Sequence, residues 1–440
     1  MSTRWEQVTK LIERYPDLPP EVVFKEDVLR TGLAFSEDAL RIAAGYQPKA
    51  YFIFSFDLVP IDQMPNREHL RVPEEIGLVG GPNDFRRTVV SVRVNPGSPY
   101  RVGLSNGGRL VLRLEDLEVA EVLYPPRPSF YGQTLSSGKS LMEIAPVIEW
   151  GYLIYLTVFR LCQYFGKEEE CRFCDINENF RQQRRNGRSY TAVKTLDEVL
   201  EALAIIAAED TAGRAYTLTG GSVVTRLDGL DEADFYARYA EAIEARFPGR
   251  WISKAVVQAL PREGLRRLYD AGVRICHNNY EVWDARLFSL LCAGKQRHIG
   301  RDEWIRRILE ASEVFGPTHV IPNFVAGVEM ARPYGFTDVG QALDSTCEGL
   351  AFFMANGILP RFTTWCPEPL SHLGKHNREG APLEYHVGLL HRWRCLLEEF
   401  RLPDPPGYGP PGIGRAVFSV SSFMDVIRPN GVPVDASPAP

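Results

Sequence analysis

From about residue 150 to residue 370, continuous apolar runs alternate with segments of helical periodicity. The apolar runs are short, rich in β-branched and aromatic residues and bounded by polar or glycine-containing turns, which is typical of buried strands. Six strands are predicted within residues 151–162, 214–221, 251–260, 273–281, 318–327 and 358–367. Helices are predicted at 194–210, 230–247, 262–272, 301–315 and 336–357, with a late helix at 384–400. Buried strands joined through helices predict a parallel sheet covered by helices, either open and doubly wound or closed into a full or partial barrel.

The rest of the chain has other patterns. Between about residues 50 and 125, alternating runs are separated by the turn sequences GGPND, NPGSP and SNGG, which predict antiparallel strands. The predicted segments are 1–48 (helical), 49–130 (a small β-rich module), 150–370 (the parallel unit), 371–428 (a C-terminal extension with a helix) and 429–440 (a Pro-rich, disordered tail).

Composition narrows the class of protein. The chain has 440 residues, a net charge of −6, 45% hydrophobic and 24% charged residues, as in ordinary soluble globular proteins. The slight acidity gives no reason to expect nucleic acid or a membrane surface as a partner. No apolar stretch approaches the roughly 20 residues of a membrane span, and the N-terminus lacks the apolar run of a signal peptide, so we expect a cytoplasmic protein. In that compartment, clustered cysteines indicate metal or redox chemistry.

Three cysteines follow the first strand of the parallel unit with the spacing C-x8-C-x2-C, at Cys162, Cys171 and Cys174. The carboxyl end of such a strand is where parallel α/β sheets bind ligands. Iron–sulfur clusters are held by cysteine thiolates, usually four, so a cluster with three leaves one iron open to a small ligand. A zinc site with three protein ligands is the alternative, although no histidine lies close in the sequence.

This loop resembles that of the radical S-adenosylmethionine (radical SAM) superfamily, whose usual spacing is C-x3-C-x2-C. The aromatic residue before the last cysteine, Phe173 in CRFC, is also similar. The resemblance implies a partial (β/α)6, TIM-like barrel, here preceded by a smaller N-terminal α+β module. It implies a [4Fe–4S] cluster whose open iron binds S-adenosylmethionine (SAM), with Phe173 beside the adenine. Reductive cleavage of SAM would then give a 5′-deoxyadenosyl radical that abstracts hydrogen from a substrate.

Other strand ends match the superfamily in part. Gly220 and Gly221 correspond to a Gly-Gly-Glu-like motif that binds the amino group of SAM, with Ser222 in place of the acidic residue. Asn279 and Glu281, after the fourth strand, are the expected ribose- or carboxylate-binding groups. The full set of cofactor-binding residues that the resemblance implies is Phe173, Gly220, Gly221, Ser222, Asn279, Glu281, Gly327 and Glu329.

Several alternatives stay open at this stage. Each position has a structural interpretation: glycines in an ordinary turn, and polar residues that hydrogen-bond within a loop. Lys254, early in the third strand, could pair with the SAM carboxylate as a point charge, although a surface lysine is the favoured interpretation. The protein could also be a zinc-dependent hydrolase or lyase on an α/β barrel, or a non-catalytic iron–sulfur protein. The remaining cysteines are scattered, so a second cluster is not expected. For a radical SAM enzyme we expect a small-molecule substrate, with a peptide or carrier protein as the alternative, and an external electron donor of the flavodoxin or ferredoxin type. No catalytic residue is assigned.

Overall fold

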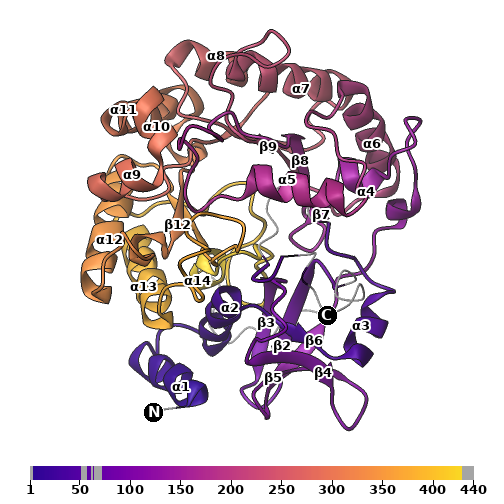
Figure 1. Cartoon of the computed structure of the whole chain (residues 1–440), viewed down its shortest axis with the longest axis vertical. Coiled ribbons are helices and arrows are strands. Elements are labelled where there is room, and N and C mark those ends of the chain that lie inside the picture. The colour runs from indigo at the N-terminus through magenta and orange to yellow at the C-terminus, as the bar shows by residue number, and fades with distance from the viewer. Residues whose placement is uncertain (1–2, 51–56, 61–62, 64–71, 429–440) are drawn as a thin grey trace.

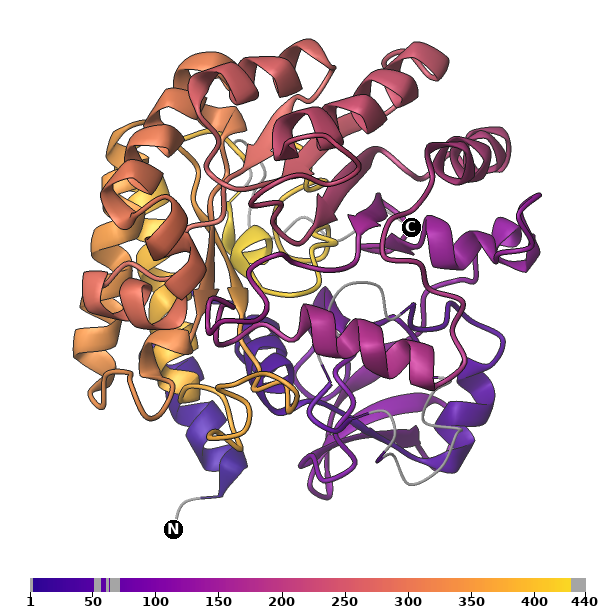
Figure 2. The same ribbon diagram turned by 45° about the horizontal axis from the view of Figure 1, so that its top comes forward.

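The computed structural model describes residues 3–50, 57–60, 63 and 72–428. The predicted tail, 429–440, and most of the apolar run at 50–60 lie outside the described residues. Figures 1 and 2 show a β-rich part next to a larger α/β part, with helices in an arc around the outside of the α/β strands. No helix among the described residues is long and apolar enough to cross a bilayer.

The N-terminal segment contains three helices and a short strand. These are α1 (Arg4–Arg14), α2 (Pro20–Thr31), β1 (Ala34–Phe35) and α3 (Glu37–Ala43). Helix α1 begins at a capping box formed by Thr3 and Glu6, which satisfies backbone N–H groups that have no partner within the helix. Helix α2 is buried along its whole length because it packs between the β-rich sheet and α13 (Leu383–Glu399).

The β-rich part is a six-stranded sheet with the strand order β1-β4-β5-β6-β2-β3. Its longer strands are β2 (Glu75–Gly80), β3 (Phe85–Ser91), β4 (Tyr100–Leu104), β5 (Leu110–Leu114) and β6 (Leu117–Leu123). The turn sequences GGPND, NPGSP and SNGG connect β2 to β3, β3 to β4 and β4 to β5, where the local chemistry favours reversal of the chain. Strand β1, from the segment expected to be helical, adds a parallel edge to β4.

A short connection leads to the parallel unit. It consists of η3 (Ser129–Gly132), α4 (Leu141–Ile144) and β7 (Val147–Ile148). The six parallel strands are β8 (Leu153–Phe159), β9 (Ala215–Gly220), β10 (Ile252–Val256), β11 (Ile275–His277), β12 (Asn323–Ala326) and β13 (Arg361–Thr364). The main helices between them are α5 (Ile176–Arg185), α6 (Leu196–Glu209), α7 (Glu232–Arg246), α8 (Arg262–Asp270), α9 (Ala285–Leu291), α10 (Ala293–His298), α11 (Arg301–Phe315) and α12 (Val339–Ala355).

The parallel strands follow one another in space in chain order. Strands β8 to β11 form one sheet, β12 and β13 form another, and parallel bridges from Cys276 to Val320 and from Glu281 to Phe324 join the two. Among the described residues, β13 does not pair with β8 or β7, so the barrel stays open on that side. The predicted α/β architecture with a partial barrel is confirmed, and no closed barrel forms.

The C-terminal extension returns to the open side of the barrel. After α13 the chain runs to α14 (Phe423–Val426), and on the way Val420 accepts a hydrogen bond from Thr364 of β13 while Ser419 accepts one from Ser91 of β3. The barrel and the β-rich sheet are therefore joined through residues that lie near the end of the chain.

Candidate functional site

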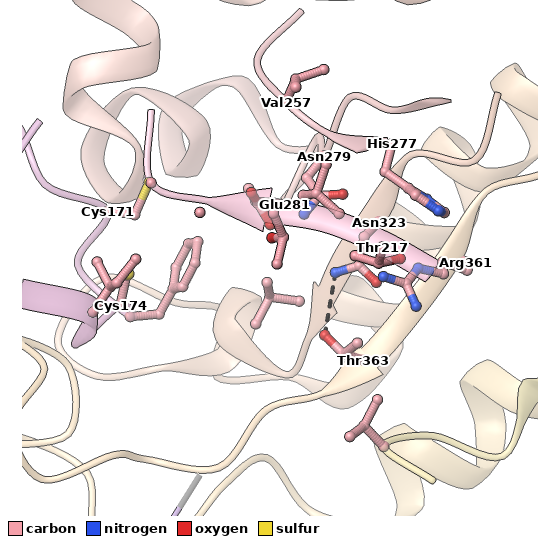
Figure 3. A pocket seen from close by; sticks show the side chains of 18 of the residues that line it. Cys171, Cys174, Thr217, Val257, His277, Asn279, Glu281, Asn323, Arg361 and Thr363 are labelled. Carbon is pink, nitrogen blue, oxygen red and sulfur yellow. Dashed lines mark hydrogen bonds between the residues drawn. The ribbon is translucent and has the colours of Figure 1, made fainter. Parts of the chain in front are cut away.

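A cavity of about 240 Å³ runs through the barrel from the carboxyl ends of the strands towards their beginnings. Figure 3 shows Cys171 and Cys174 at one end and Arg361, Asn323 and Thr363 at the other. Other cavity-lining side chains from the strands and from the loops that follow them are those of Tyr155, Cys162, Phe173, Thr217, Lys254, Gln258, His277, Asn279 and Glu281. The three cysteines of the motif therefore line one cavity, at the edge of the sheet where the sequence predicts the site.

The cysteine loop is held by contacts from several elements. The backbone N–H of Cys162 donates to Asn177 Oδ1 of α5 at 2.8 Å, and Cys162 Sγ accepts a hydrogen bond from the backbone N–H of Ser222 at 3.3 Å. Cys174 N–H donates to Cys171 O at 2.9 Å, which forms a tight turn between these two cysteines. Arg172 N–H donates to Leu291 O at 2.8 Å, so the loop is also tied to α9.

The thiols of the loop lie in surroundings that disfavour the thiolate unless a cation is present. Burial, with a smaller contribution from the neighbouring Cys171, raises the pKa of Cys162 to about 12. Burial also raises the pKa of Cys174 well above its ordinary value, again with a contribution from Cys171. Because a metal ligand must be the thiolate, positive iron bound at this position would compensate both effects. The donor set and its surroundings fit a bound iron–sulfur group.

The described residues contain no group of three His, Cys, Asp or Glu side chains that converge on a single metal ion. In a [4Fe–4S] cluster each cysteine binds a different iron atom, so its ligands do not have to converge on one point. The arrangement of the three cysteines around one cavity is compatible with such a cluster.

A fourth cysteine, which the sequence did not associate with the site, lies next to the loop. Cys292 forms a backbone bridge with Cys171, and its thiol hydrogen-bonds with that of Cys171. Cys292 is fully buried and is not among the residues that line the cavity. It therefore supports Cys171 from the protein interior, while Cys162, Cys171 and Cys174 face the cavity.

Gly220 and Gly221 lie in the cavity wall, and their backbones pack against the start of the cysteine loop. A Cβ atom on Gly220 would lie 2.3 Å from Phe159 O, and one on Gly221 would lie 2.1 Å from Leu161 O. These glycines are therefore required for close packing between β9 and the segment that carries Cys162. Ser222, the next residue, contributes its N–H to the Cys162 sulfur.

An acidic group that sequence reasoning missed lies beside this turn. Glu232, in the first turn of α7, lines the cavity and accepts hydrogen bonds from Val223 N at 2.6 Å and from Gln258 N and Nε2 at 2.6 and 2.7 Å. Burial raises the pKa of Glu232, and these donors oppose the increase. The carboxylate thus links the segments that follow β9 and β10. It lies near Ser222, the residue that replaces the acidic residue of the Gly-Gly-Glu-like motif.

Asn279 and Glu281 both line the cavity, as predicted from their position after the fourth strand. Glu281 forms a buried ion pair with Lys295 Nζ at 2.6 Å, and the same ammonium group donates to Asn279 O at 2.8 Å. Lys295 also lies over the indole ring of Trp304, 4.4 Å from its centroid. Glu281 is thus neutralised by the protein, whereas the Asn279 Oδ1 atom is buried and has no hydrogen-bond partner in the described structure.

Phe173 lines the cavity beside the cysteines, but Gly327 and Glu329 do not line it. Glu329 is buried, accepts hydrogen bonds from Gly327 N at 2.9 Å and from the Thr346 hydroxyl at 2.7 Å, and closes the turn after β12. Burial raises the pKa of Glu329 to about 7. The structure gives Gly327 and Glu329 a bracing role in place of the predicted contact with the adenine.

The other end of the cavity contains Lys254, for which a surface position was favoured, and Arg361, which the sequence did not assign to a site. Lys254 is 2% exposed, so the expectation of a surface lysine is wrong. It donates to Gly407 O at 2.8 Å and lies 4.4 Å from the ring centroid of Tyr408. Arg361 lies 5.4 Å from the Tyr408 centroid and 5.3 Å from that of Phe418. A charged residue within an otherwise apolar strand was the available signal, because such a side chain must point into a polar cavity or find a partner.

Comparison with known proteins adds a likeness of fold. No family model and no curated protein match the chain. Among solved structures the chain is similar to methylornithine synthase (PylB), with 15% identity and a TM-score of 0.39 over 55% of this chain and 62% of that one. It is also similar to HydG, a maturase of the [FeFe]-hydrogenase, with 12% identity and a TM-score of 0.39 over 63% of this chain and 61% of HydG.

The chain thus spans less than two thirds of either protein's length. At these identities and scores the likeness is one of general fold, and the role of each residue in this chain has to come from its own site.

Proposed function

We propose that this protein is a radical SAM enzyme that acts on a small molecule. The observation that carries the proposal is the position of Cys162, Cys171 and Cys174 around one end of a cavity that continues into the parallel barrel. In this assignment the thiolates of Cys162, Cys171 and Cys174 would hold a [4Fe–4S] cluster, and the cavity that they line would admit SAM. When bound, the cluster and SAM supply a 5′-deoxyadenosyl radical for hydrogen abstraction.

The chain's own residues would orient the reactants and exclude water. Phe173 and the Gly220–Gly221 turn form the cavity wall next to the cysteines. The loop after β13 packs on this region, where Leu373 N–H donates to Arg172 O of the cysteine loop at 2.8 Å. Tyr408 and Phe418 cover the opposite end. Side chains that cover both ends of the cavity limit the access of water to a reactive intermediate.

The size of the cavity and its enclosure favour a small molecule over a peptide or a carrier protein. The cavity volume of about 240 Å³ is below the range of roughly 300–1,000 Å³ that is typical of ligand pockets, which leaves little room for a large substrate. We also propose an external electron donor of the flavodoxin or ferredoxin type.

The test is anaerobic reconstitution with iron and sulfide, followed by SAM and dithionite. The expected results are about four irons per chain and formation of 5′-deoxyadenosine, whereas about one zinc in the purified protein would support a zinc enzyme instead. Single changes of Cys162, Cys171 or Cys174 to Ala should abolish both cluster and SAM cleavage. Cys395→Ala, at an exposed position on α13, is the matched control and should retain both.

A variant of the buried Cys292 distinguishes the proposed cluster, which has three thiolate ligands, from a closed cluster with four. If only three cysteines bind iron, Cys292→Ala should retain the iron content and still cleave SAM. Loss of iron in Cys292→Ala, together with a cluster spectrum that SAM does not alter, would support a non-catalytic iron–sulfur protein and contradict the proposal.

A further inference from the structure

The end of the cavity away from the cysteines, here called the barrel floor, is formed by Lys254, Arg361, Asn323, Glu149 and Tyr408. Lys254 pairs in register with Thr217, which pairs with Tyr155 of β8. Phe159, the last residue of β8, is four positions further along, so the floor lies ~13 Å below the strand ends that carry the cysteine loop. Figure 3 shows this separation between Cys171 and Arg361.

The floor carries two cations and one carboxylate. Neither Lys254 nor Arg361 has a carboxylate oxygen within 4.0 Å among the described residues, although both contact the face of Tyr408. Glu149 is the acidic residue nearest to Lys254 in electrostatic terms. Burial raises the pKa of Glu149 and lowers that of Lys254, and the attraction between the two groups opposes both shifts.

Glu75 and Lys25, which do not line the cavity, also act on Glu149, and their effects on its pKa are opposite in direction. His277 faces Arg361 and Lys254, and burial together with these cations lowers its pKa well below the ordinary value, so it is neutral. Two basic side chains, Lys254 and Arg361, therefore line the floor opposite one carboxylate, that of Glu149. This excess of basic groups favours a bound anion, because an uncompensated charge in a cavity is costly.

Two amides on the cavity wall have hydrogen-bonding capacity to spare. Asn323 Nδ2 donates to the Thr363 hydroxyl at 3.2 Å, and its buried Oδ1 has no partner in the described structure. The buried Oδ1 of Asn279, closer to the cysteines, is also without a partner. Whichever way the Asn323 amide is turned, only one of its two polar atoms contacts Thr363, and the other is left for a ligand.

We propose that the floor binds the carboxylate of the substrate, and that the substrate is a small acid with a hydroxyl or amino group that meets Asn323 or Asn279. This assignment rests on the proposed radical SAM function for the reaction, but the binding site can be tested by itself. Arg361 supplies a planar fork of donors that matches a carboxylate, and Lys254 adds a point charge. A substrate anchored in this way presents its carbon skeleton towards the cysteine end of the cavity.

Formate is the suitable probe, because it is the smallest carboxylate and does not depend on the rest of the substrate. Its affinity for the reconstituted full-length protein is measured by titration with ¹³C-formate. The melting temperature of the protein is also measured at constant ionic strength with formate and, for comparison, with chloride, formamide or inorganic phosphate. Formate should bind and raise the melting temperature, and the other probes should not. Arg361→Gln should weaken formate binding at least tenfold, Arg361→Lys should restore part of it, and Arg266→Gln, an exposed arginine on α8, should bind as the wild type does.

The proposal is overturned if wild-type protein does not bind formate, if phosphate or formamide matches it, or if Arg361→Gln binds it unchanged. Should Arg361→Gln fail to fold, Lys254→Gln provides the same comparison. Formation of 5′-deoxyadenosine without substrate is measured in parallel. Loss of SAM cleavage in wild-type protein with intact formate binding would count against the radical SAM function alone, and the reverse would count against the floor alone.

Discussion

Gly221→Ala tests how closely the second parallel strand must approach the cysteine loop. The added methyl group would lie 2.1 Å from Leu161 O, 2.3 Å from Cys162 Cβ and 2.4 Å from Cys162 Cα. These are backbone or first side-chain atoms, so no change of rotamer can relieve the contact. The two segments must separate by roughly 1 Å before the atoms reach van der Waals distance, an overpacking that typically costs about 1–3 kcal/mol.

The separation acts directly on a proposed cluster ligand. Cys162 Sγ accepts its hydrogen bond from Ser222 N–H at 3.3 Å, and Ser222 follows Gly221 in the chain. Movement of this turn therefore displaces the sulfur and removes a donor to it. We expect Gly221→Ala to bind much less iron and sulfide after anaerobic reconstitution, with a lower urea midpoint.

The matched control is Gly132→Ala in η3, where an added Cβ would meet no heavy atom within 4 Å. This variant should keep the wild-type iron content and stability. If Gly221→Ala reconstitutes as fully as Gly132→Ala, the close contact does not position Cys162, and the structural role given to the two glycines is refuted.

Two further predictions concern buried charges. Lys295→Met leaves the buried Glu281 carboxylate without its cation and should lower the free energy of unfolding by about 3–5 kcal/mol. The measurement is urea denaturation, with Lys10→Met, at an exposed position, as the control. Equal stability of the two variants would contradict a stabilising role for the ion pair. Burial raises the pKa of Glu329 to about 7, so between about pH 4.5 and 7 the folded protein keeps a proton that the unfolded chain has released. As the pH rises through this range, the wild type should therefore lose stability relative to Glu329→Gln, by on the order of 3 kcal/mol. Above pH 7 this group should cause no further loss. A constant difference between the two across that pH range would show that Glu329 is ionised throughout.

Much of the architecture could be predicted from local patterns. The predicted helix at 301–315 has the same bounds as α11, because an amphipathic stripe of apolar residues records which face of a helix is buried. The three cysteines were identified for a similar reason, since they lie close in sequence and follow a strand whose carboxyl end has a known place in parallel sheets. Their position around one cavity required no information from distant parts of the chain.

The composition of the site at its other end could not be predicted in this way. Tyr408 and Phe418 cover Lys254 and Arg361 from a segment that is up to about 150 residues away in the chain, through contacts that no local periodicity encodes. The same holds for Cys292, which reaches Cys171 only after α9 has packed against the loop.

The sequence by itself therefore determined the order of strands and helices, the parallel unit and the place of the three cysteines after its first strand, because these depend on short-range spacing and on which faces are apolar. Only the tertiary structure decided that Lys254 is buried, that Gly327 and Glu329 brace a turn outside the cavity, and that Glu232 and Arg361 line it. The physical reason is that burial and electrostatic pairing depend on which distant segment covers each strand end, and that choice is made by packing of the whole chain.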